Sequence, residues 1–330
     1  MRAVASYRGL PVEDPESLVD VELPLPEPGP RDVVVRVGAV SVNPVDIKLR
    51  PGLPASDPPR VLGFDAAGVV ESVGAEVTTL QAGDEVWYAG DITRPGSNAE
   101  FQAVDERLVA RKPRSLGFAE AAALPLTTIT AWETLFERFA LTRGSTGTLL
   151  ALGGAGGVGS ILIQLAKQLT GLRVLASAGR PESARWVTGL GADAVVDHHD
   201  LAATVGAAAP DGVDYVLSPH SAGMIETFAQ LVRPGGHITA IDEPEGLDVL
   251  PLKARSIAWH WEFMFTRPMY RTPDMIEHKN VLQKVADLVD DGRVRTTVTT
   301  TIEDFSAAGL RRAHGMVESG RTVGKVVVTR

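Results

Sequence analysis

A run of glycines between residues 154 and 159 has the composition and spacing of a phosphate-binding loop. Gly154, Gly156 and Gly159 match the pattern GxGxxG, and Gly157 and Val158 lie between them. The run follows the apolar segment TLLALG and opens GVGSILIQLAKQL, whose apolar spacing is helical. There Gly154 permits a tight turn, Gly156 lets the main chain approach a pyrophosphate, and Gly159 allows close packing of helix on strand. The loop therefore predicts a dinucleotide cofactor at the helix N-terminus.

The segment after the next predicted strand indicates which dinucleotide binds. An NAD-binding fold places Asp or Glu there, about twenty residues beyond the glycines, to bind the ribose. This chain has Ser177 and Arg180 in that segment and no carboxylate. A hydroxyl and a guanidinium can bind a 2′-phosphate, which a carboxylate would repel. NADPH is therefore the expected cofactor; the alternative is that Arg180 is simply solvated at a helix start.

Missing residue types limit the remaining chemistry. The chain contains no cysteine, which excludes disulfides, iron–sulfur clusters, thiolate nucleophiles and zinc sites with sulfur ligands. One class of dehydrogenase works without a metal by using Tyr and Lys four residues apart, and none of the four tyrosines here has lysine at that spacing. Oxidation of a simple alcohol therefore lacks a catalyst.

Composition and charge narrow the class of protein. With 330 residues, 44% hydrophobic and 22% charged, the chain is long enough for about two domains. Its net charge of −9 disfavours nucleic-acid binding, which needs a basic face. The uncharged stretch 144–166 could span a bilayer by length, but its glycines favour a strand, a loop and a helix. Without cysteine or an export signal, we expect a cytoplasmic protein that binds neither nucleic acid nor membrane.

Two kinds of segment must position the glycine loop and the residues around it. Residues 1–124 are β-rich, with valine-rich strands such as 32–40 and 66–73 separated by Pro and Gly. From about residue 148, apolar strands alternate with helices. This alternation predicts βαβ units and a doubly wound parallel sheet, which makes the chain an α/β protein.

The remaining third of the chain returns to β-rich character. Residues 257–265 alternate and predict a strand, with all the tryptophan and phenylalanine side chains of the segment on one face. Helical spacing follows over 274–291, and β segments at 294–301 and 326–329 come last. The last segment resembles the first, which predicts a discontinuous domain that flanks an inserted one.

Seven motifs make the chain resemble the medium-chain dehydrogenase/reductase superfamily, close to the quinone oxidoreductases and the zinc-type alcohol dehydrogenase-like proteins. They are NPVDIK from Asn43, GFDAAGVVESVG from Gly63, GDEV from Gly83, LPLTTITAWE from Leu124, GGAGGVG from Gly153, LGADAVVDH from Leu190 and GKVVV from Gly324. The resemblance implies a GroES-like catalytic domain over 1–124 and 268–330, and a Rossmann domain over 125–267. It also implies a homodimer that forms through the strand at 257–265.

The resemblance also exposes what the chain lacks. Relatives that use catalytic zinc bind it through residues that include cysteines and a histidine, and these positions fall on Asn43, Phe64 and, nearby, Leu126. None of the three could hold zinc as those enzymes do, so no metal is expected. His198 and His199 follow a predicted strand and should point in opposite directions. A surface or cofactor-edge position suits them better than a metal site.

Without a metal, a conjugated acceptor is the favoured substrate. Zinc would stabilise the alkoxide of a simple alcohol. A quinone or an α,β-unsaturated carbonyl instead spreads the incoming negative charge, so hydrogen bonds and bound NADPH can suffice. Lys48 comes two residues after Asp46 and is expected on the same side of the segment. By resemblance, Asn43, Asp46 and Lys48 lie beside the nicotinamide, with Asn43 orienting the carboxamide or substrate oxygen and Lys48 donating to the oxyanion. Alternatively, Asn43 only forms a turn with Pro44, and Lys48 is solvated.

The resemblance assigns further residues to the cofactor. They are Thr127, Thr130, Ser218, Ile241, Phe265 and Lys325, the two threonines at positions that contact the nicotinamide. Asp65 matches an acidic residue that the family uses structurally. Leu53 stands where quinone reductases often carry a tyrosine, which argues against proton transfer by tyrosine.

Two functions from different classes follow. The first is an NADPH-dependent, metal-free oxidoreductase that transfers hydride to quinones or α,β-unsaturated carbonyls. The alternative is a non-catalytic NADPH-binding structural or sensor protein of the zeta-crystallin type, and turnover of conjugated acceptors distinguishes the two. A zinc-dependent alcohol dehydrogenase is disfavoured because its metal ligands are missing.

Overall fold

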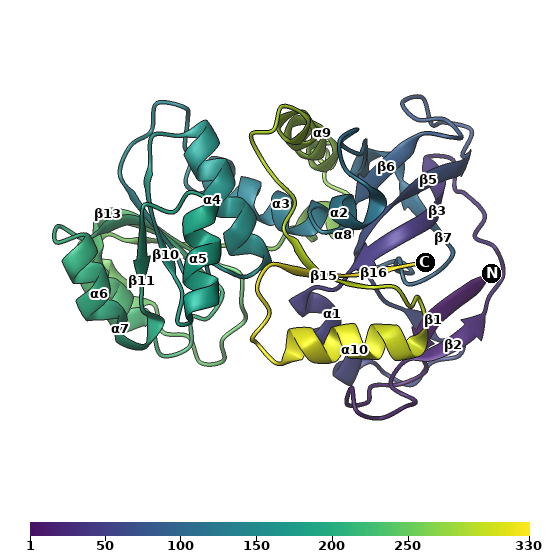
Figure 1. The fold of residues 1–330 in the computed structure, drawn as a ribbon, viewed down its shortest axis with the longest axis horizontal. Coiled ribbons are helices and arrows are strands. Elements are labelled where there is room, and N and C mark those ends of the chain that lie inside the picture. The colour runs from purple at the N-terminus through teal and green to yellow at the C-terminus, as the bar shows by residue number, and fades with distance from the viewer. The chain divides into compact units, whose positions relative to one another are not determined.

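The chain folds into two compact units, one of them discontinuous in sequence (Figure 1). In this computed structural model, which describes residues 1–330, the first unit combines Met1–Ile129 with Phe265–Arg330. The second unit is the inserted segment Thr130–Met264. These cuts lie a few residues from the predicted boundaries at 124 and 268. None of the helices is both long enough and apolar enough to cross a lipid bilayer.

The first unit is built on a seven-stranded sheet. Six strands follow the order β15–β16–β3–β5–β6–β8, and β7 pairs with β3. Their bounds are β3 (Asp32–Ser41), β5 (Asp65–Val73), β6 (Glu85–Tyr88), β7 (Phe101–Asp105), β8 (Val109–Arg111), β15 (Val298–Ile302) and β16 (Lys325–Thr329). β16 pairs antiparallel with β3, which Figure 1 shows as a yellow strand beside a purple one. This pairing joins the two sequence segments into one sheet.

Smaller elements complete the first unit. A second sheet has the order β2–β1–β4, formed by β1 (Arg2–Ser6), β2 (Val19–Glu22) and β4 (Arg60–Val61). The helices are α1 (Pro44–Leu49), α2 (Phe118–Ala122), α8 (Thr266–Tyr270), α9 (Glu277–Asp290) and α10 (Ala307–Glu318), and α3 (Pro125–Trp132) begins here. α10 packs against β16 and α1. Val35 of β3, Leu310 of α10 and Val326 of β16 are buried in one core cluster, which fixes β16 beside β3.

The second unit is the predicted doubly wound parallel sheet. Its strand order is β11–β10–β9–β12–β13–β14, and every pair is parallel. The strands are β9 (Thr148–Ala151), β10 (Arg173–Ser177), β11 (Ala194–Val196), β12 (Val213–Ser218), β13 (Val232–Ala240) and β14 (Ala258–Trp261). The helices are α4 (Gly157–Leu169), α5 (Pro181–Gly189), α6 (Leu201–Ala208) and α7 (Ile225–Leu231). Right-handed crossovers place α4 and α5 on one face and α6 and α7 on the other, and Figure 1 shows each pair side by side.

The strand predicted at 257–265 is shorter in the structure. β14 ends at Trp261, and a new helix, α8, begins at Thr266. Trp261 is 52% exposed and Phe265 is buried, so the predicted common aromatic face does not form. The last ladder hydrogen bond runs from Glu262 N–H to Ala240 O, and the Glu262 side chain is buried. The alternating pattern therefore predicted the strand but not its end.

Candidate functional site

The glycine loop after β9 is held together by contacts that leave no space for side chains. A Cβ atom on Gly159 would lie 2.6 Å from both Gly153 O and Gly154 Cα. A Cβ atom on Gly154 would lie 2.9 Å from the Cβ of Ala176 on β10. The backbone conformation that requires glycine falls on Gly153, with φ at 60°, and not on Gly154 as predicted. Gly154 is needed instead for its close approach to the neighbouring strand.

The start of α4 suits an anionic ligand. Gly156 is the N-cap of this helix and has an extended conformation, and Gly157 and Val158 are its first residues. No side chain caps the helix, whose first turn contains no acidic residue. The main-chain N–H groups and the helix dipole therefore favour a phosphate group there. A closely packed glycine turn followed by an uncapped helix fits a dinucleotide pyrophosphate.

The two residues predicted to select NADPH lie at the end of β10 and the start of α5. Ser177 is buried, and its Oγ accepts a hydrogen bond from Gly153 N at 2.9 Å, so it anchors the glycine loop. Arg180 is the N-cap residue of α5 and is only partly exposed. Its main-chain N donates to Ser183 Oγ at 3.2 Å. Binding of a 2′-phosphate by Ser177 and Arg180 stays a prediction.

The adjacent histidines do not point apart as predicted. They begin a 3₁₀ turn, His198–Asp200, and their ring centroids lie 4.0 Å apart. In a 3₁₀ turn, successive side chains are rotated about the axis by less than the half-turn that separates them in a strand. The prediction that the two imidazoles point in opposite directions was wrong because it assumed a strand. A Cβ atom on Gly179 would lie 2.3 Å from His198 Cε1, so this imidazole covers the main chain next to Arg180.

Of the remaining predicted cofactor residues of the second unit, Ser218 and Ile241 lie at the carboxyl ends of central strands and Thr130 lies on a helix. Ser218 ends β12, and its hydroxyl lies 2.9 Å from that of Ser221. Ile241 follows β13 and donates its N–H to Ser218 O at 3.0 Å. Thr130 is buried on α3. In doubly wound folds this edge of the sheet is where dinucleotides bind.

A buried polar network in the first unit is centred on Asp65. One carboxylate oxygen, Oδ2, accepts hydrogen bonds from Asn43 Nδ2 at 2.7 Å and from Lys325 Nζ at 3.2 Å. The other, Oδ1, accepts the main-chain N–H of Leu126 at 2.7 Å. All three side chains, Asp65, Asn43 and Lys325, are at most 4% exposed. The network therefore joins β5, β16 and the segments that begin α1 and α3.

Lys325 is the cation of this network. Besides Asp65, its Nζ donates to Asn43 Oδ1 at 2.5 Å and to Val42 O at 3.1 Å, which uses all three N–H groups. Burial lowers the pKa of Lys325, against the effect of Asp65, and burial raises the pKa of Asp65 against that of the ammonium. Both ends of the Asn43 amide are thus fixed, with Oδ1 on the ammonium and Nδ2 on the carboxylate.

Asp46 is a second buried carboxyl group close to this network. Its Oδ2 accepts the N–H of Asn43 at 2.7 Å, and its Oδ1 accepts the N–H of Gly63 at 3.1 Å. Burial raises the pKa of Asp46 to about 7, against the effect of these two hydrogen bonds and of Lys325. Asp46 therefore fixes the start of α1 and holds a proton over part of the physiological pH range.

Lys48 does not join this group. The prediction that Asp46 and Lys48 lie on the same side of their segment is wrong, because residues 44–49 form a helix. Residues two apart in a helix point to nearly opposite sides, and accordingly Asp46 is buried while Lys48 is exposed. A role for Lys48 as oxyanion donor is untested.

Two further predicted cofactor residues of the first unit are buried. The Thr127 hydroxyl donates to Leu124 O at 3.0 Å. Phe265 packs edge-to-face on Phe64, with ring centroids 5.3 Å apart. Phe64 therefore provides an aromatic contact at the position where zinc-dependent relatives are expected to have a histidine.

The donor set around Asn43 does not fit a zinc ion. The three positions expected to supply zinc ligands hold an amide, a phenyl ring and an aliphatic side chain. Both ends of the amide are engaged, and an ammonium group lies 2.5 Å from its oxygen. A cation at that distance repels a metal ion, and no thiolate or imidazole is present to offset the repulsion. No step of the chemistry is therefore assigned to zinc.

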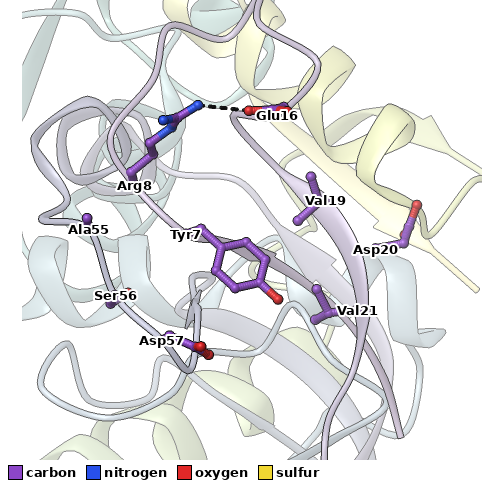
Figure 2. A pocket seen from close by; sticks show the side chains of 9 residues that line it. All are labelled: Tyr7, Arg8, Glu16, Val19, Asp20, Val21, Ala55, Ser56 and Asp57. Atoms are coloured by element: carbon purple, nitrogen blue, oxygen red, sulfur yellow. Dashed lines mark hydrogen bonds and ion pairs between the residues drawn. The ribbon is translucent and has the colours of Figure 1, made fainter.

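A surface pocket lies elsewhere in the first unit (Figure 2). It has a volume of about 810 Å³ and is lined mainly by residues of 7–8, 16–21 and 55–57. Figure 2 shows the Tyr7 ring at its centre and the Arg8–Glu16 ion pair, 2.9 Å long, at its rim. None of the predicted site residues lines this pocket, so it is separate from the candidate site.

Two buried acidic residues of the second unit were not predicted. Glu133 and Glu262 have side chains that are 3% and 0% exposed, and both contact Arg138. A signal was present, since Glu133 interrupts the apolar segment LTTITAWETLF, and a charged residue in such a segment must find a partner. Arg138, five residues on, contacts Glu133, whereas Glu262 is remote in sequence and could not be found.

Comparisons with known proteins agree with this architecture. Residues 29–129 match the model of the alcohol dehydrogenase GroES-like domain, and residues 190–328 match that of the zinc-binding dehydrogenases. A zinc-type alcohol dehydrogenase-like protein of Staphylococcus epidermidis is 37% identical, over 99% of each chain. The chloroplastic NADPH-dependent alkenal/one oxidoreductase of Arabidopsis thaliana is 34% identical, over 98% of this chain and 78% of the relative.

Solved structures show the same fold. A protein from Rhizobium etli CFN 42 is 48% identical, with a TM-score of 0.96 over 100% of this chain and 98% of that one. The Escherichia coli quinone oxidoreductase, solved in complex with NADPH, shares the fold with a TM-score of 0.86 over 100% of each chain, at 22% identity. The β-rich unit, the inserted parallel sheet and these relatives identify the chain as an oxidoreductase of the medium-chain dehydrogenase/reductase superfamily.

Proposed function

We propose that this protein is a metal-free reductase that uses NADPH to transfer hydride to conjugated acceptors, either quinones or α,β-unsaturated carbonyls. The observation that carries the proposal is the bonding of Lys325. Its ammonium group donates to Asn43, Asp65 and Val42 within the region where the zinc-dependent relatives are expected to bind their metal. A site built around a buried cation cannot supply a Lewis acid for a simple alcohol.

The residues of the second unit have a binding role in this proposal. The turn at Gly153 and Gly154 and the uncapped start of α4 would hold the pyrophosphate, and Ser177 and Arg180 would hold the 2′-phosphate. Bound NADPH supplies the hydride. The chain's own contribution is to fix the cofactor through main-chain N–H groups, which need no rearrangement when the ligand binds.

The residues of the first unit have a positioning role. The Asn43 amide cannot rotate, because its oxygen accepts from Lys325 and its nitrogen donates to Asp65. Its proposed task is to orient the nicotinamide carboxamide or the acceptor oxygen, and it does not transfer a proton. A conjugated acceptor needs little more than orientation, since the incoming charge is delocalised over an enolate or a hydroquinone anion.

The names of two relatives support this substrate class. The Arabidopsis thaliana protein is named an NADPH-dependent alkenal/one oxidoreductase. A 2-methylene-furan-3-one reductase of Solanum lycopersicum is 35% identical over 90% of this chain. Both names describe reduction of a carbonyl compound that carries a conjugated double bond.

Steady-state turnover after removal of metals tests the proposal. The protein is first dialysed against a strong chelator. Reduction of 2-cyclohexenone, a benzoquinone and cyclohexanone is then assayed with NADPH, and oxidation of cyclohexanol is assayed with NADP⁺. We expect the two conjugated acceptors to be reduced at an undiminished rate, and the saturated pair to react at least about 100-fold more slowly, which corresponds to about 2.7 kcal/mol of barrier. A rate for cyclohexanol equal to that for 2-cyclohexenone, or activity restored only by zinc, would refute the proposal.

An Asn43→Ala variant tests the positioning role. We expect kcat for 2-cyclohexenone to fall about tenfold or more while the Kd for NADPH changes less, because the lost contact belongs to the reacting end of the cofactor. Asn280→Ala is the matched control, since the Asn280 side chain donates to Glu277 of its own helix. Tight NADPH binding without turnover of any acceptor would favour the non-catalytic alternative.

A further inference from the structure

Glu133, Glu262 and Arg138 form a buried charge cluster in the second unit. Arg138 Nε donates to Glu262 Oε2 at 2.9 Å, and its Nη2 lies 3.8 Å from Glu133 Oε2. The two glutamate side chains are almost completely buried, whereas one third of the Arg138 side chain is exposed. Fully ionised, the cluster would have two buried negative charges and one partly exposed positive charge.

A π-helical turn produces this arrangement. Residues Glu133–Arg138 continue α3 with wider turns, and Phe139 N donates to Thr134 O, five residues earlier. In such a turn residues five apart lie above one another, so Glu133 and Arg138 share one face. Single π-helical turns are rare in proteins and are frequent at functional sites.

The hydrogen bonding of Glu262 indicates one excess proton. Burial raises the pKa of Glu262 well above its usual range, and the charge of Glu133 and a hydrogen bond to it raise it further, against the effect of Arg138. Two buried carboxylates that share one guanidinium cannot both stay ionised without an uncompensated buried charge, so one of them must carry a proton. Glu262 Oε1 is buried and has no hydrogen-bond partner. With one proton bound, the cluster is neutral.

The other titratable groups nearby add no charge near neutral pH. His237 and His260 of neighbouring strands contact each other through ring nitrogens 3.0 Å apart, and Tyr215 stacks on His237. Burial lowers the pKa of both histidines and raises that of Tyr215, so all three stay neutral. Arg138 and Glu133 are therefore the charged groups that act on Glu262.

Main-chain hydrogen bonds place the cluster at the cofactor edge of the sheet. Glu262 N donates to Ala240 O at the carboxyl end of β13, next to Ile241, which in turn bonds to Ser218 of β12. The residues predicted to bind the adenosine ribose follow β10, on the other side of β9. A dinucleotide extends along this edge from one half of the sheet to the other. The nicotinamide half therefore belongs to β12, β13 and β14.

We propose that Glu133 and Glu262 hold a single proton between them, and that binding of an oxidised, cationic nicotinamide at this edge releases it. The proposal rests on the proposed function, because it needs a nicotinamide cofactor. The positive charge of the oxidised nicotinamide ring stabilises the deprotonated cluster. The reduced ring is neutral, so with NADPH the protonated cluster is favoured. By linkage, the affinity for NADP⁺ then rises with pH and that for NADPH does not. Glu133 and Glu262 act on the nicotinamide only through the charge of the cluster, and neither needs to contact the substrate.

Infrared spectroscopy of the protein without cofactor tests the shared proton. The test uses an Asp46→Asn background, because the buried Asp46 carboxyl also holds a proton near pH 7. In this background at pH 7 we expect a protonated-carboxyl C=O band that is lost when either Glu133→Gln or Glu262→Gln is added. The band should remain in Glu226→Gln, the control, because Glu226 is an exposed residue of α7. Each of the two variants keeps one carboxylate that pairs with Arg138. The cluster therefore stays neutral, and we expect both variants to fold. A band that survives in both variants would overturn the shared proton.

Calorimetric titration in buffers of different ionisation enthalpy tests the linkage. We expect NADP⁺ to release up to one proton on binding and NADPH to release none, with an affinity for NADP⁺ that rises by up to about tenfold per pH unit. In Glu262→Gln, NADP⁺ should bind without release, while Glu226→Gln should behave like the unaltered protein. NADP⁺ binding without proton release in the unaltered protein would overturn the linkage. Failure of both dinucleotides to bind would refute the proposed cofactor, and the infrared result would still decide whether the proton is held.

Discussion

Asp46 and Asp65 are buried carboxyl groups of the same unit, and only Asp65 contacts a cation. Lys325 bonds directly to Asp65, whereas Asp46 has two main-chain N–H donors and feels the ammonium only through space. One ammonium cannot offset the burial of two carboxylates, and each carboxylate also disfavours ionisation of the other. Burial therefore raises the pKa of both carboxyl groups, and Asp65 is the one that is paired directly with the cation.

Replacing Asp46 should change how stability depends on pH. Its pKa rises from 3.8 to about 7 on folding, so the folded state binds the proton more tightly than the unfolded state. This contribution is complete below about pH 4 and is lost as the pH rises through about 7, with an upper limit of about 4 kcal/mol. Asp46→Asn has no such proton. In denaturant titrations from pH 4 to 8, the unaltered protein should lose stability relative to the variant, and two parallel curves would contradict the assignment.

Arg180 allows a test of cofactor choice at the same scale. Arg180→Glu should raise the KM for NADPH about 10- to 100-fold and change that for NADH little, because a charge-assisted bond to a phosphate is worth about 1.5–3 kcal/mol. Arg185→Glu is the matched control, since Arg185 is exposed on the same helix. Equal use of NADPH and NADH by the unaltered protein would remove the basis of the prediction.

At the scale of elements, the glycine loop and α4 act as one body. Gly159 lies in the first turn of α4, and its missing side chain lets the helix touch the loop at Gly153 and Gly154. The contacts are with main-chain atoms, which cannot move aside as the end of a side chain could. The position of the helix N-terminus, and with it the anion site, therefore depends on the absence of one methyl group.

Gly159→Ala tests this dependence against a matched glycine. The added Cβ atom would lie 2.6 Å from main-chain atoms, so we expect a loss of stability of about 1–3 kcal/mol and weaker NADPH binding. Gly206→Ala, within α6, meets nothing within 4 Å. It should leave binding unchanged and increase stability by up to about 1 kcal/mol. Thermal unfolding and fluorescence titration with NADPH measure both, and similar results for the two variants would show that the close contact is unimportant.

Sequence periodicity predicted elements well where the local pattern alone decides the structure. The segment predicted as a helix after the glycines matches α4, because its apolar spacing and its glycine start agree. Periodicity failed to predict the direction of the Lys48 side chain, because the helix of six residues after Asn43 is too short to show a period. It also failed for the Glu133–Glu262 pair, since no local signal reveals a partner that only the folded sheet brings near. Lys325 was predicted to line the cofactor, and its bonds to Asn43 and Asp65 needed the pairing of β16 with β3.

At the scale of the whole molecule, the parallel sheet has two open edges of unlike character. β14 pairs only with β13, and beside it Trp261 and Phe263 are 52% and 40% exposed. β11 is the opposite edge and is only three residues long, with Val195 38% exposed. An unpaired edge strand with large aromatic side chains is a surface on which another strand can pair. Homodimerisation through β14 stays a prediction, and this edge is its proposed surface.

Trp261→Lys should weaken self-association. A charge at the edge of β14 disfavours strand pairing, and the loss of a large apolar contact costs about 2 kcal/mol or more, so the dimer Kd should rise at least about 30-fold. Val195→Lys on β11 is the matched control and should leave the Kd unchanged. Sedimentation over a range of concentrations measures both. A monomeric unaltered protein, or an equal effect of both variants, would exclude this edge as the dimer surface.

The place of β16 in the sheet has a consequence for how the protein is made. Residues 325–329 lie beside residues 39–41 and carry the only cation of the Asp65 network. The ribosome adds these residues long after β3 and β5 have emerged. Until then the sheet of the first unit is incomplete, and Asp65 is neither buried nor paired with a cation. The inserted parallel sheet, Thr130–Met264, has all its strands available earlier. Translation therefore completes the inserted unit first, and a message truncated before codon 325 yields a chain that contains the whole inserted unit but cannot complete the sheet of the first unit.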